Sequence, residues 1–160
     1  MSEVRALSFR LNGVDTSVTV DTRRTVADML RWDLRLTGTT VGCEQGVCGT
    51  CTIIVDGAPV RACLMLAVQL DGAEVRTIEG LVREGKLQAL QEAFVEEDAV
   101  QCGFCTSGFL VLATAALESD PFMEDEAIDA LVAANLCRCT GYGPIRRAVR
   151  KAARANRRAT

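Results

Sequence analysis

The chain has 160 residues, of which 49% are apolar, 24% charged and 4% aromatic, and its net charge is -3. This composition is typical of a globular protein and excludes general disorder, and the negative balance argues against a nucleic-acid partner. Histidine is absent, which excludes Cys₂His₂ zinc sites, Rieske centres, histidine-ligated haem and histidine-dependent catalytic triads.

The first half of the chain has the period of β-strands. Leu7, Phe9 and Leu11 alternate with polar residues, as in a half-buried strand. The Asn12-Gly13 pair that follows is a strong hairpin signal, and it predicts a second strand ending near Val20. The same kinds of signal predict three further elements: a helix opened by Thr25, a hairpin of strands 52–55 and 60–64 around Asp56-Gly57, and a strand at 75–78.

From about Lys86 the apolar residues recur at helical spacing. Four helices are expected, carried by Leu87 to Phe94, by Phe109 to Leu117, by Ile128 to Val132, and by a segment starting at Pro144. The change of period predicts an α+β protein with two small domains. We place the first at residues 1–78, a linker at 79–85 and the second at 86–160.

Cysteine is the unusual residue, and four cysteines fall in each half. In the first half Cys43, Cys48, Cys51 and Cys63 are spaced C-x₄-C-x₂-C-x₁₁-C. The first three spacings are those of plant-type [2Fe–2S] ferredoxins. Structural zinc is the alternative, but it favours two short pairs of ligands over three ligands together and one alone.

The second half holds two short pairs, Cys102-x₂-Cys105 and Cys137-x-Cys139. Spacing alone leaves this motif open between a zinc ion and an iron–sulfur cluster. The first pair lies between the first two of the four expected helices and the second pair between the last two. Four thiolates from these turns would meet at one end of a helix bundle.

The segments GCEQGVCGTCTIIVDGAPVRAC, QCGFCTSGF and NLCRCTGYGPI together resemble the small iron–sulfur subunit of the molybdenum hydroxylases. This family includes xanthine dehydrogenase, aldehyde oxidoreductase and aerobic carbon monoxide dehydrogenase. The resemblance covers nearly the whole chain and implies two [2Fe–2S] clusters. It places the first in a β-grasp ferredoxin-like domain and the second in a four-helix domain. One departure is Ser107, where relatives often carry proline.

The resemblance also implies the surroundings of the two clusters. Gln101 is similar to a glutamine that contacts the pterin of the molybdenum cofactor, and Cys139 to a cysteine whose sulfur lies near the same pterin. A buried amide that caps a helix end is the alternative for Gln101. The implied partners are a large subunit with molybdopterin and a middle subunit with FAD, in a hetero-oligomer such as a dimer of heterotrimers.

No group of side chains in the sequence offers a general acid, a base or a nucleophile, so no catalytic residue is expected on this chain. The function implied is an electron-transfer subunit of an oxidoreductase, which passes single electrons from the molybdopterin centre through two clusters to FAD. A free-standing ferredoxin-type shuttle and a zinc-stabilised interaction module are the alternatives. The Phe109–Leu117 stretch is too short to span a membrane, and eight thiols without a visible signal peptide predict a cytoplasmic protein.

The basic residues are concentrated near the end of the chain. The C-terminal segment holds seven of them: Arg146, Arg147, Arg150, Lys151, Arg154, Arg157 and Arg158. A solvated helix face and a contact with an acidic partner are both compatible with this pattern.

Overall fold

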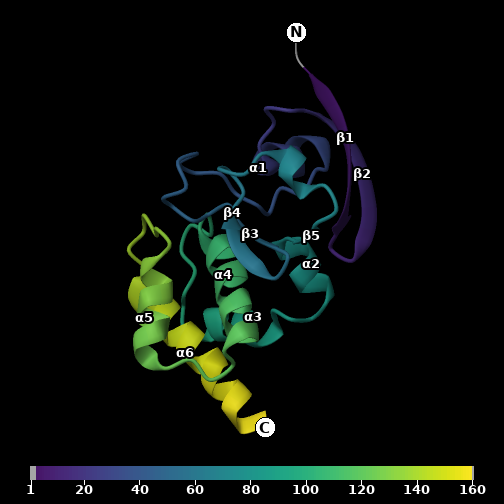
Figure 1. The fold of residues 1–160 in the computed structure, drawn as a ribbon. Coiled ribbons are helices and arrows are strands. Elements are labelled where there is room, and N and C mark those ends of the chain that lie inside the picture. The colour runs from purple at the N-terminus through teal and green to yellow at the C-terminus, as the bar shows by residue number, and fades with distance from the viewer. Residues whose placement is uncertain (1–2, 160) are drawn as a thin grey trace.

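The computed structural model describes residues 3–159, with side chains as far as residue 155, as a mixed sheet followed by a group of helices (Figure 1). The strands are β1 (Val4–Leu11), β2 (Val14–Asp21), β3 (Thr52–Val55), β4 (Ala58–Arg61) and β5 (Glu74–Arg76). The helical segments are α1 (Val26–Asp28), η1 (Met29–Asp33), η2 (Ala67–Leu70), α2 (Ile78–Arg83), α3 (Gln88–Glu96), α4 (Thr106–Ser119), α5 (Asp125–Ala133) and α6 (Tyr142–Ala159). The predicted order of a β-rich half and a helical half is confirmed.

The strands form one sheet in the order β2-β1-β5-β3-β4, with β1 and β5 parallel and the other pairs antiparallel. This is the β-grasp arrangement that the resemblance implies. Asn12 and Gly13 both have positive φ, 50° and 80°, as a two-residue hairpin turn requires, and Asp56 and Gly57 repeat this geometry at 49° and 81°. The two hairpins therefore form where the turn dipeptides predict them.

Several boundaries differ from the prediction. The second strand of the second hairpin ends at Arg61 instead of residue 64, and the last strand ends at Arg76. The backbone N–H of Thr77 donates to the Asn12 side chain, 2.8 Å away, which takes Thr77 out of the sheet. Residues 78–83 then form helix α2, where the end of a strand and the linker 79–85 were expected, and Leu81 is fully buried in this helix.

Two of the predicted helix starts also have a clear outcome. Thr25 accepts a hydrogen bond from the Asp28 backbone N–H, as expected of an N-cap residue. The α-helix that it opens has only three residues and continues as the π-helical turn η1. Helix α6 begins at Tyr142, two residues before the expected start at Pro144.

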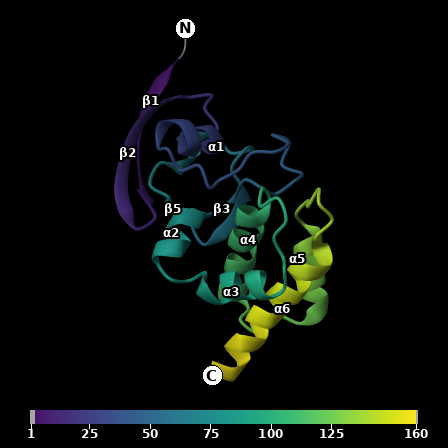
Figure 2. The ribbon, with the colours of Figure 1, turned by 180° about the vertical axis from the view of Figure 1, so that it is seen from behind.

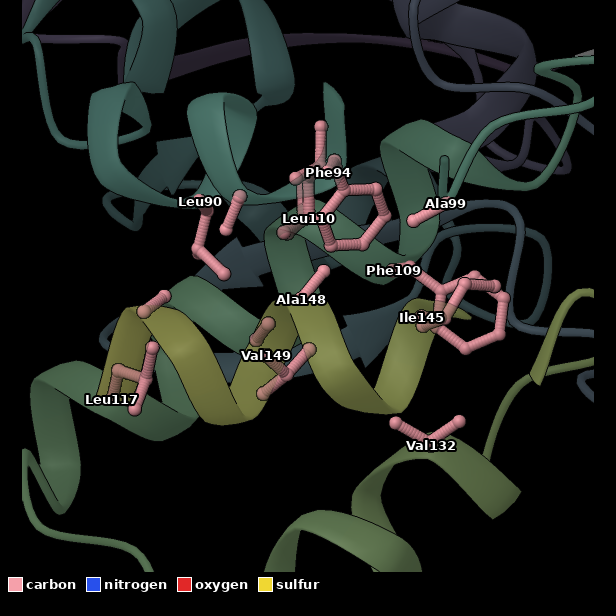
Figure 3. Packing of buried hydrophobic residues seen from close by; sticks show 14 of the residues in the cluster. Leu90, Phe94, Ala99, Phe109, Leu110, Leu117, Val132, Ile145, Ala148 and Val149 are labelled. Atoms are coloured by element: carbon pink, nitrogen blue, oxygen red, sulfur yellow. The ribbon is translucent and has the colours of Figure 1, made fainter. Parts of the chain in front are cut away.

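Strand β3 joins two hydrophobic cores. Successive side chains of a strand point to opposite faces, so Ile53 packs into the core of the sheet domain and Ile54 into the core of the helices. Helix α4 lies against β3 in both ribbon views (Figures 1 and 2). On its other side α4 packs with α3 and α6, where Phe109 and Leu110 meet Phe94, Ile145 and Val149 (Figure 3).

The basic residues of α6 are paired within the chain. Every basic side chain of α6 that the structure describes contacts a carboxylate. The carboxylates lie on α3, on α5 or on Glu97, which follows α3. The pairs are Arg146 with Asp129, Arg147 with Glu97, Arg150 with Asp129, Lys151 with Glu96, and Arg154 with Asp125. The side chains of Arg157 and Arg158 lie outside the described residues. The basic segment therefore holds α6 against its neighbouring helices. Neither α6 nor any other helix within residues 3–159 is long and apolar enough to cross a membrane.

Candidate metal centres

The first cysteine group is assembled by the long loop before β3 and by the β3–β4 hairpin. Thr52 of β3 pairs with Arg61 of β4, so Cys51 and Cys63 lie close together just beyond the paired residues. The Ala62 N–H donates to the Cys51 carbonyl, 3.2 Å away, and the Cys51 and Cys63 thiols are within hydrogen-bonding reach of each other. The hairpin therefore fixes one pair of sulfurs.

The other pair of this group, Cys43 and Cys48, lies in the loop itself. The backbone N–H groups of Gln45 and Cys48 both point at Cys43 Sγ, each at 3.4 Å. These hydrogen bonds, that of Cys48 first, lower the pKa of the Cys43 thiol to about 6. Positive φ values at Glu44 and Gly46 turn the chain so that the amides face inward, a backbone arrangement that binds anions. The loop is thus built to hold a thiolate.

Cys51 has the opposite environment. Burial raises the pKa of its thiol to about 11, because a buried thiolate without a counter-charge is unfavourable. A bound cation removes this penalty by coordinating the thiolate. Cys51 can therefore become a thiolate ligand when a metal ion coordinates it.

The second cysteine group lies at one end of the helices. Cys102 and Cys105 precede α4, and Cys137 and Cys139 lie between α5 and α6. The thiols of Cys102 and Cys139 are within hydrogen-bonding reach of each other, and so are those of Cys105 and Cys137. The four thiols predicted from two separate turns are thus brought together.

As in the first group, hydrogen bonds lower the pKa of one thiol and burial raises the pKa of another. The Phe104 backbone N–H, and then the Cys139 thiol, lower the pKa of Cys102. Burial, and then the Cys137 thiol, raise the pKa of Cys105 to about 12. The Gly141 N–H also donates to Cys137 Sγ, 3.4 Å away.

In both groups the thiols meet in pairs. Across the described part of the chain, no three cysteine, aspartate or glutamate side chains are close enough together to hold a single metal ion. A zinc ion takes its four thiolates around one point, whereas a [2Fe–2S] cluster takes two thiolates on each of two irons. The pairing of the thiols is compatible with two thiolates on each of two irons.

Gln101 is exposed beside the second group. Its side-chain amide donates to the Cys139 carbonyl, 3.2 Å away, so it links the two cysteine pairs. It is neither buried nor at a helix end, so the alternative interpretation as a buried capping amide is wrong. Nearby, the Tyr142 hydroxyl accepts a hydrogen bond from the Cys137 backbone N–H at 2.9 Å.

The two cysteine groups lie close to each other. The loop before β3 and the loop between α5 and α6 meet at the same end of α4 in both views (Figures 1 and 2). One cavity of about 670 Å³ is lined by cysteines of both groups: Cys43, Cys48, Cys102, Cys105 and Cys137. The Thr40 hydroxyl donates across this region to the Phe104 carbonyl, 2.9 Å away.

Two contacts at the first group were not predicted from the sequence. The Thr50 hydroxyl lies 3.4 Å from Cys48 Sγ, and the Leu136 backbone N–H donates to the Cys48 carbonyl. The only sequence signal for either residue is its place beside a cysteine.

Comparisons with known proteins also find two iron–sulfur domains in this chain. The chain matches the family described as "2Fe-2S iron-sulfur cluster binding domain" over residues 9–81 and the family described as "[2Fe-2S] binding domain" over residues 77–150. It is 52% identical to the nicotine 6-hydroxylase small subunit of Paenarthrobacter nicotinovorans, over 89% of this chain and 86% of the relative. It is also 52% identical to the caffeine dehydrogenase subunit gamma of a Pseudomonas species, over 90% and 88%.

Among solved structures, the chain is similar to a chain of quinoline 2-oxidoreductase from Pseudomonas putida 86. The TM-score is 0.90 and the sequence identity 46%, and the match covers 98% of both chains.

Proposed function

Because the chain belongs to the family of small iron–sulfur subunits of molybdenum hydroxylases, we propose that it relays single electrons between two partner proteins through its two cysteine groups. It is a subunit of an oxidoreductase and contains two [2Fe–2S]-binding domains. In this proposal the chain performs no substrate chemistry itself.

The ligands that we propose are the eight cysteines, four for each cluster. Cys43, Cys48, Cys51 and Cys63 hold the first, and Cys102, Cys105, Cys137 and Cys139 hold the second. When bound, a cluster of this type accepts and releases one electron. The backbone N–H groups at Cys43 and Cys137 stabilise the negative charge that collects on sulfur.

One observation carries the proposal of a relay. The Leu136 backbone N–H donates to the Cys48 carbonyl at 2.9 Å. Cys48 is a proposed ligand of the first group, and Leu136 is bonded directly to Cys137, a proposed ligand of the second. A single hydrogen bond therefore completes a path of otherwise covalent bonds from one site to the other.

The partners that we propose are a large subunit with molybdopterin, as electron donor, and a middle subunit with FAD, as acceptor. The exposed Gln101 and the partly buried Cys139 mark the end that faces the molybdopterin. Exposed apolar side chains adjoin the groups, Val47 and Leu64 at the first and Phe104 and Leu136 between the two, as expected for docking surfaces. A dimer of heterotrimers is the assembly that we expect.

Two further expectations belong to this proposal. We keep the division into domains 1–78 and 86–160 with a junction at 79–85, supported by one core made mainly of sheet-domain residues and one made mainly of helix residues. We also keep the cytoplasm as the compartment, because eight cysteines that serve as metal ligands are expected in a reducing compartment.

Metal analysis and spectroscopy of the purified chain test the proposal. We expect about four irons per chain and two separate one-electron signals in electron paramagnetic resonance (EPR) after reduction. Zinc in place of iron would favour the interaction module. Iron without co-purifying larger chains would favour a free shuttle, although the relatives are themselves named as subunits.

A further inference from the structure

The side chain of Arg61 spans the boundary between the two cysteine-bearing segments. Arg61 ends β4, two residues before Cys63. Its Nη2 donates to the Ala134 carbonyl, 2.8 Å away, at the end of α5. Its Nη1 contacts Thr52 Oγ1 and, at 3.5 Å, the Gly49 carbonyl. One planar guanidinium therefore binds the loop of the first group and the helix end that leads to Cys137.

The positive charge of Arg61 is bound by carbonyl and hydroxyl oxygens. No ion pair to Arg61 occurs among the residues that the structure describes. The side chain is half-buried, and hydrogen bonds from a charged donor are stronger than neutral ones. This favours one fixed geometry over a mobile surface ion pair.

The contact of Arg61 with Ala134 is the first of three consecutive contacts. Asn135 is almost fully buried, and its side-chain amide lies against Gly49. The Leu136 N–H then donates to the Cys48 carbonyl. The three residues before Cys137 are thus placed one after another against the first loop, and Arg61 holds the end of that row farthest from Cys137.

We propose that Arg61 is a positioning residue that fixes the distance between the two iron–sulfur sites and so sets the rate of electron transfer between them. This inference rests on the proposed relay. In the step concerned, one electron leaves the second site and enters the first, and no proton or atom is transferred. Arg61 contacts no sulfur in any hydrogen bond of the described residues, so it acts through the two loops it joins.

Two substitutions separate position from charge. Arg61→Met removes the charge and all the hydrogen bonds but keeps a long side chain. Arg61→Lys keeps the charge, but an ammonium cannot reproduce the planar fork that reaches both segments. Arg76→Met is the matched control, because Arg76 also joins sheet and helices, through Glu118 at 2.9 Å, and this contact involves no cysteine loop.

The experiment uses the assembled complex with its partner subunits. We expect both Arg61 variants to keep about four irons per chain. The magnetic splitting between the two reduced clusters should decrease in EPR, and electron transfer between them should slow roughly tenfold, because both depend steeply on the distance between the two centres. Arg76→Met should change neither quantity. A lower reduction potential of the first cluster in Arg61→Met alone would report the charge separately.

Unchanged splitting and rate in an iron-replete Arg61→Met variant would overturn the inference. If that variant loses iron, Arg61→Lys decides the matter by the same criteria. If Arg76→Met lowers the splitting and the transfer rate as much as Arg61→Met does, the inference is also overturned. Any loosening of the contact between sheet and helices would then be enough to slow the transfer. The relay itself is tested by the unmodified complex, in which the two clusters must exchange electrons.

Discussion

The side-chain amide of Asn135 occupies the place that a Cβ on Gly49 would take. Gly49 lies between the cysteines Cys48 and Cys51, and Asn135 lies two residues before Cys137. The contact therefore joins the two cysteine groups through backbone and side chain without any sulfur. Gly49 also has a φ of +74°, so both its conformation and its contact favour glycine.

Gly49→Ala should accordingly disturb the interface between the two groups. We expect a loss of about 2–4 kcal/mol in stability, from the left-handed backbone and from the clash with Asn135. Urea-induced loss of the iron–sulfur absorbance measures it. Gly57→Ala is the matched control, because Gly57 has a φ of +81° and nothing within 4 Å of an added Cβ. It should cost only the backbone part, about 1–2 kcal/mol, and equal losses would show that the contact contributes nothing.

Cys48→Ala and Cys137→Ala should each remove a different cluster. The thiols of one group pair only with thiols of the same group, so each substitution should leave the other four ligands in place. EPR of the reduced variants should show one of the two signals lost in each, together with about half of the iron. The loss of both signals from a folded variant would contradict the assignment of two independent sites.

Thr50→Val should lower the reduction potential of the first cluster. The Thr50 hydroxyl lies 3.4 Å from Cys48 Sγ and 3.1 Å from the Thr40 carbonyl. A thiolate and a carbonyl both only accept hydrogen bonds, so the one hydroxyl proton of Thr50 is shared between Cys48 Sγ and the Thr40 carbonyl. Its interaction with the sulfur stabilises the more negative reduced state. Losing about 0.5–1.5 kcal/mol of such stabilisation corresponds to about 20–60 mV for one electron.

Redox titration followed by EPR measures this potential. Thr40→Val is a suitable control, because the Thr40 hydroxyl donates to the Phe104 carbonyl, 2.9 Å away, and contacts no sulfur in any hydrogen bond of the described residues. It should leave the potential of the first cluster unchanged. A potential that stays constant or rises in Thr50→Val would exclude the proposed role of the hydroxyl.

Glu118 should give the interface between sheet and helices a pH-dependent contribution. Burial alone would raise the pKa of Glu118, but hydrogen bonds from Arg76 and Lys86 outweigh it and lower the pKa below its ordinary 4.5. A carboxylate with a lowered pKa stabilises the folded state above the ordinary value. That stability is lost as the pH falls through the lowered one.

Glu118→Gln should therefore reduce the unfolding free energy at neutral pH by about 0.5–1 kcal/mol, a modest value because the side chain is 36% exposed. The difference from the unmodified chain should vanish at a pH well below 4.5, and urea unfolding of the metal-free chain at both pH values measures it. Glu74→Gln is the control, because Glu74 is an exposed residue of β5 for which no ion pair is found in the described part of the chain. Its unfolding free energy should equal that of the unmodified chain at both pH values. A difference that persists in acid would mean that the glutamine substitution disturbs packing instead.

The turn dipeptides and the cysteine spacing made much of this architecture predictable. Asn12-Gly13 and Asp56-Gly57 specify both hairpins by their local conformation, and the helical period located α3, α4 and α5. Helix α2 was not predicted, because its formation depends on Asn12, 65 residues away, which binds the Thr77 N–H and ends the strand. Local patterns contain no information about such a contact.

The same limit applies to the candidate site. The eight cysteines are visible in the sequence as two groups of four. The interface between those groups depends on Arg61, Gly49 and Asn135, which come from three separate segments. No periodicity or spacing connects them, so only the folded chain brings them together. The basic α6 is a similar case, since its acidic partners lie on or beside other helices.

Gln101 provides the test of the direction in which the chain is docked. Its amide is exposed and binds the Cys139 carbonyl at 3.2 Å, so it can contact a partner while it fixes the last cysteine. Gln101→Ala should leave both clusters and the fold intact, because Gln101 is not a proposed ligand.

In the assembled complex, reduction of the clusters by substrate should slow roughly ten- to hundredfold in Gln101→Ala, because the position of the donor cofactor governs that transfer. Reoxidation through the flavin should keep its rate, and rapid mixing followed by iron–sulfur absorbance measures the two half-reactions separately. Gln91→Ala, an exposed substitution on α3, should change neither rate. Unchanged reduction by substrate with slower exchange with the flavin would mean that the second cysteine group faces the flavin subunit and the first faces the molybdopterin.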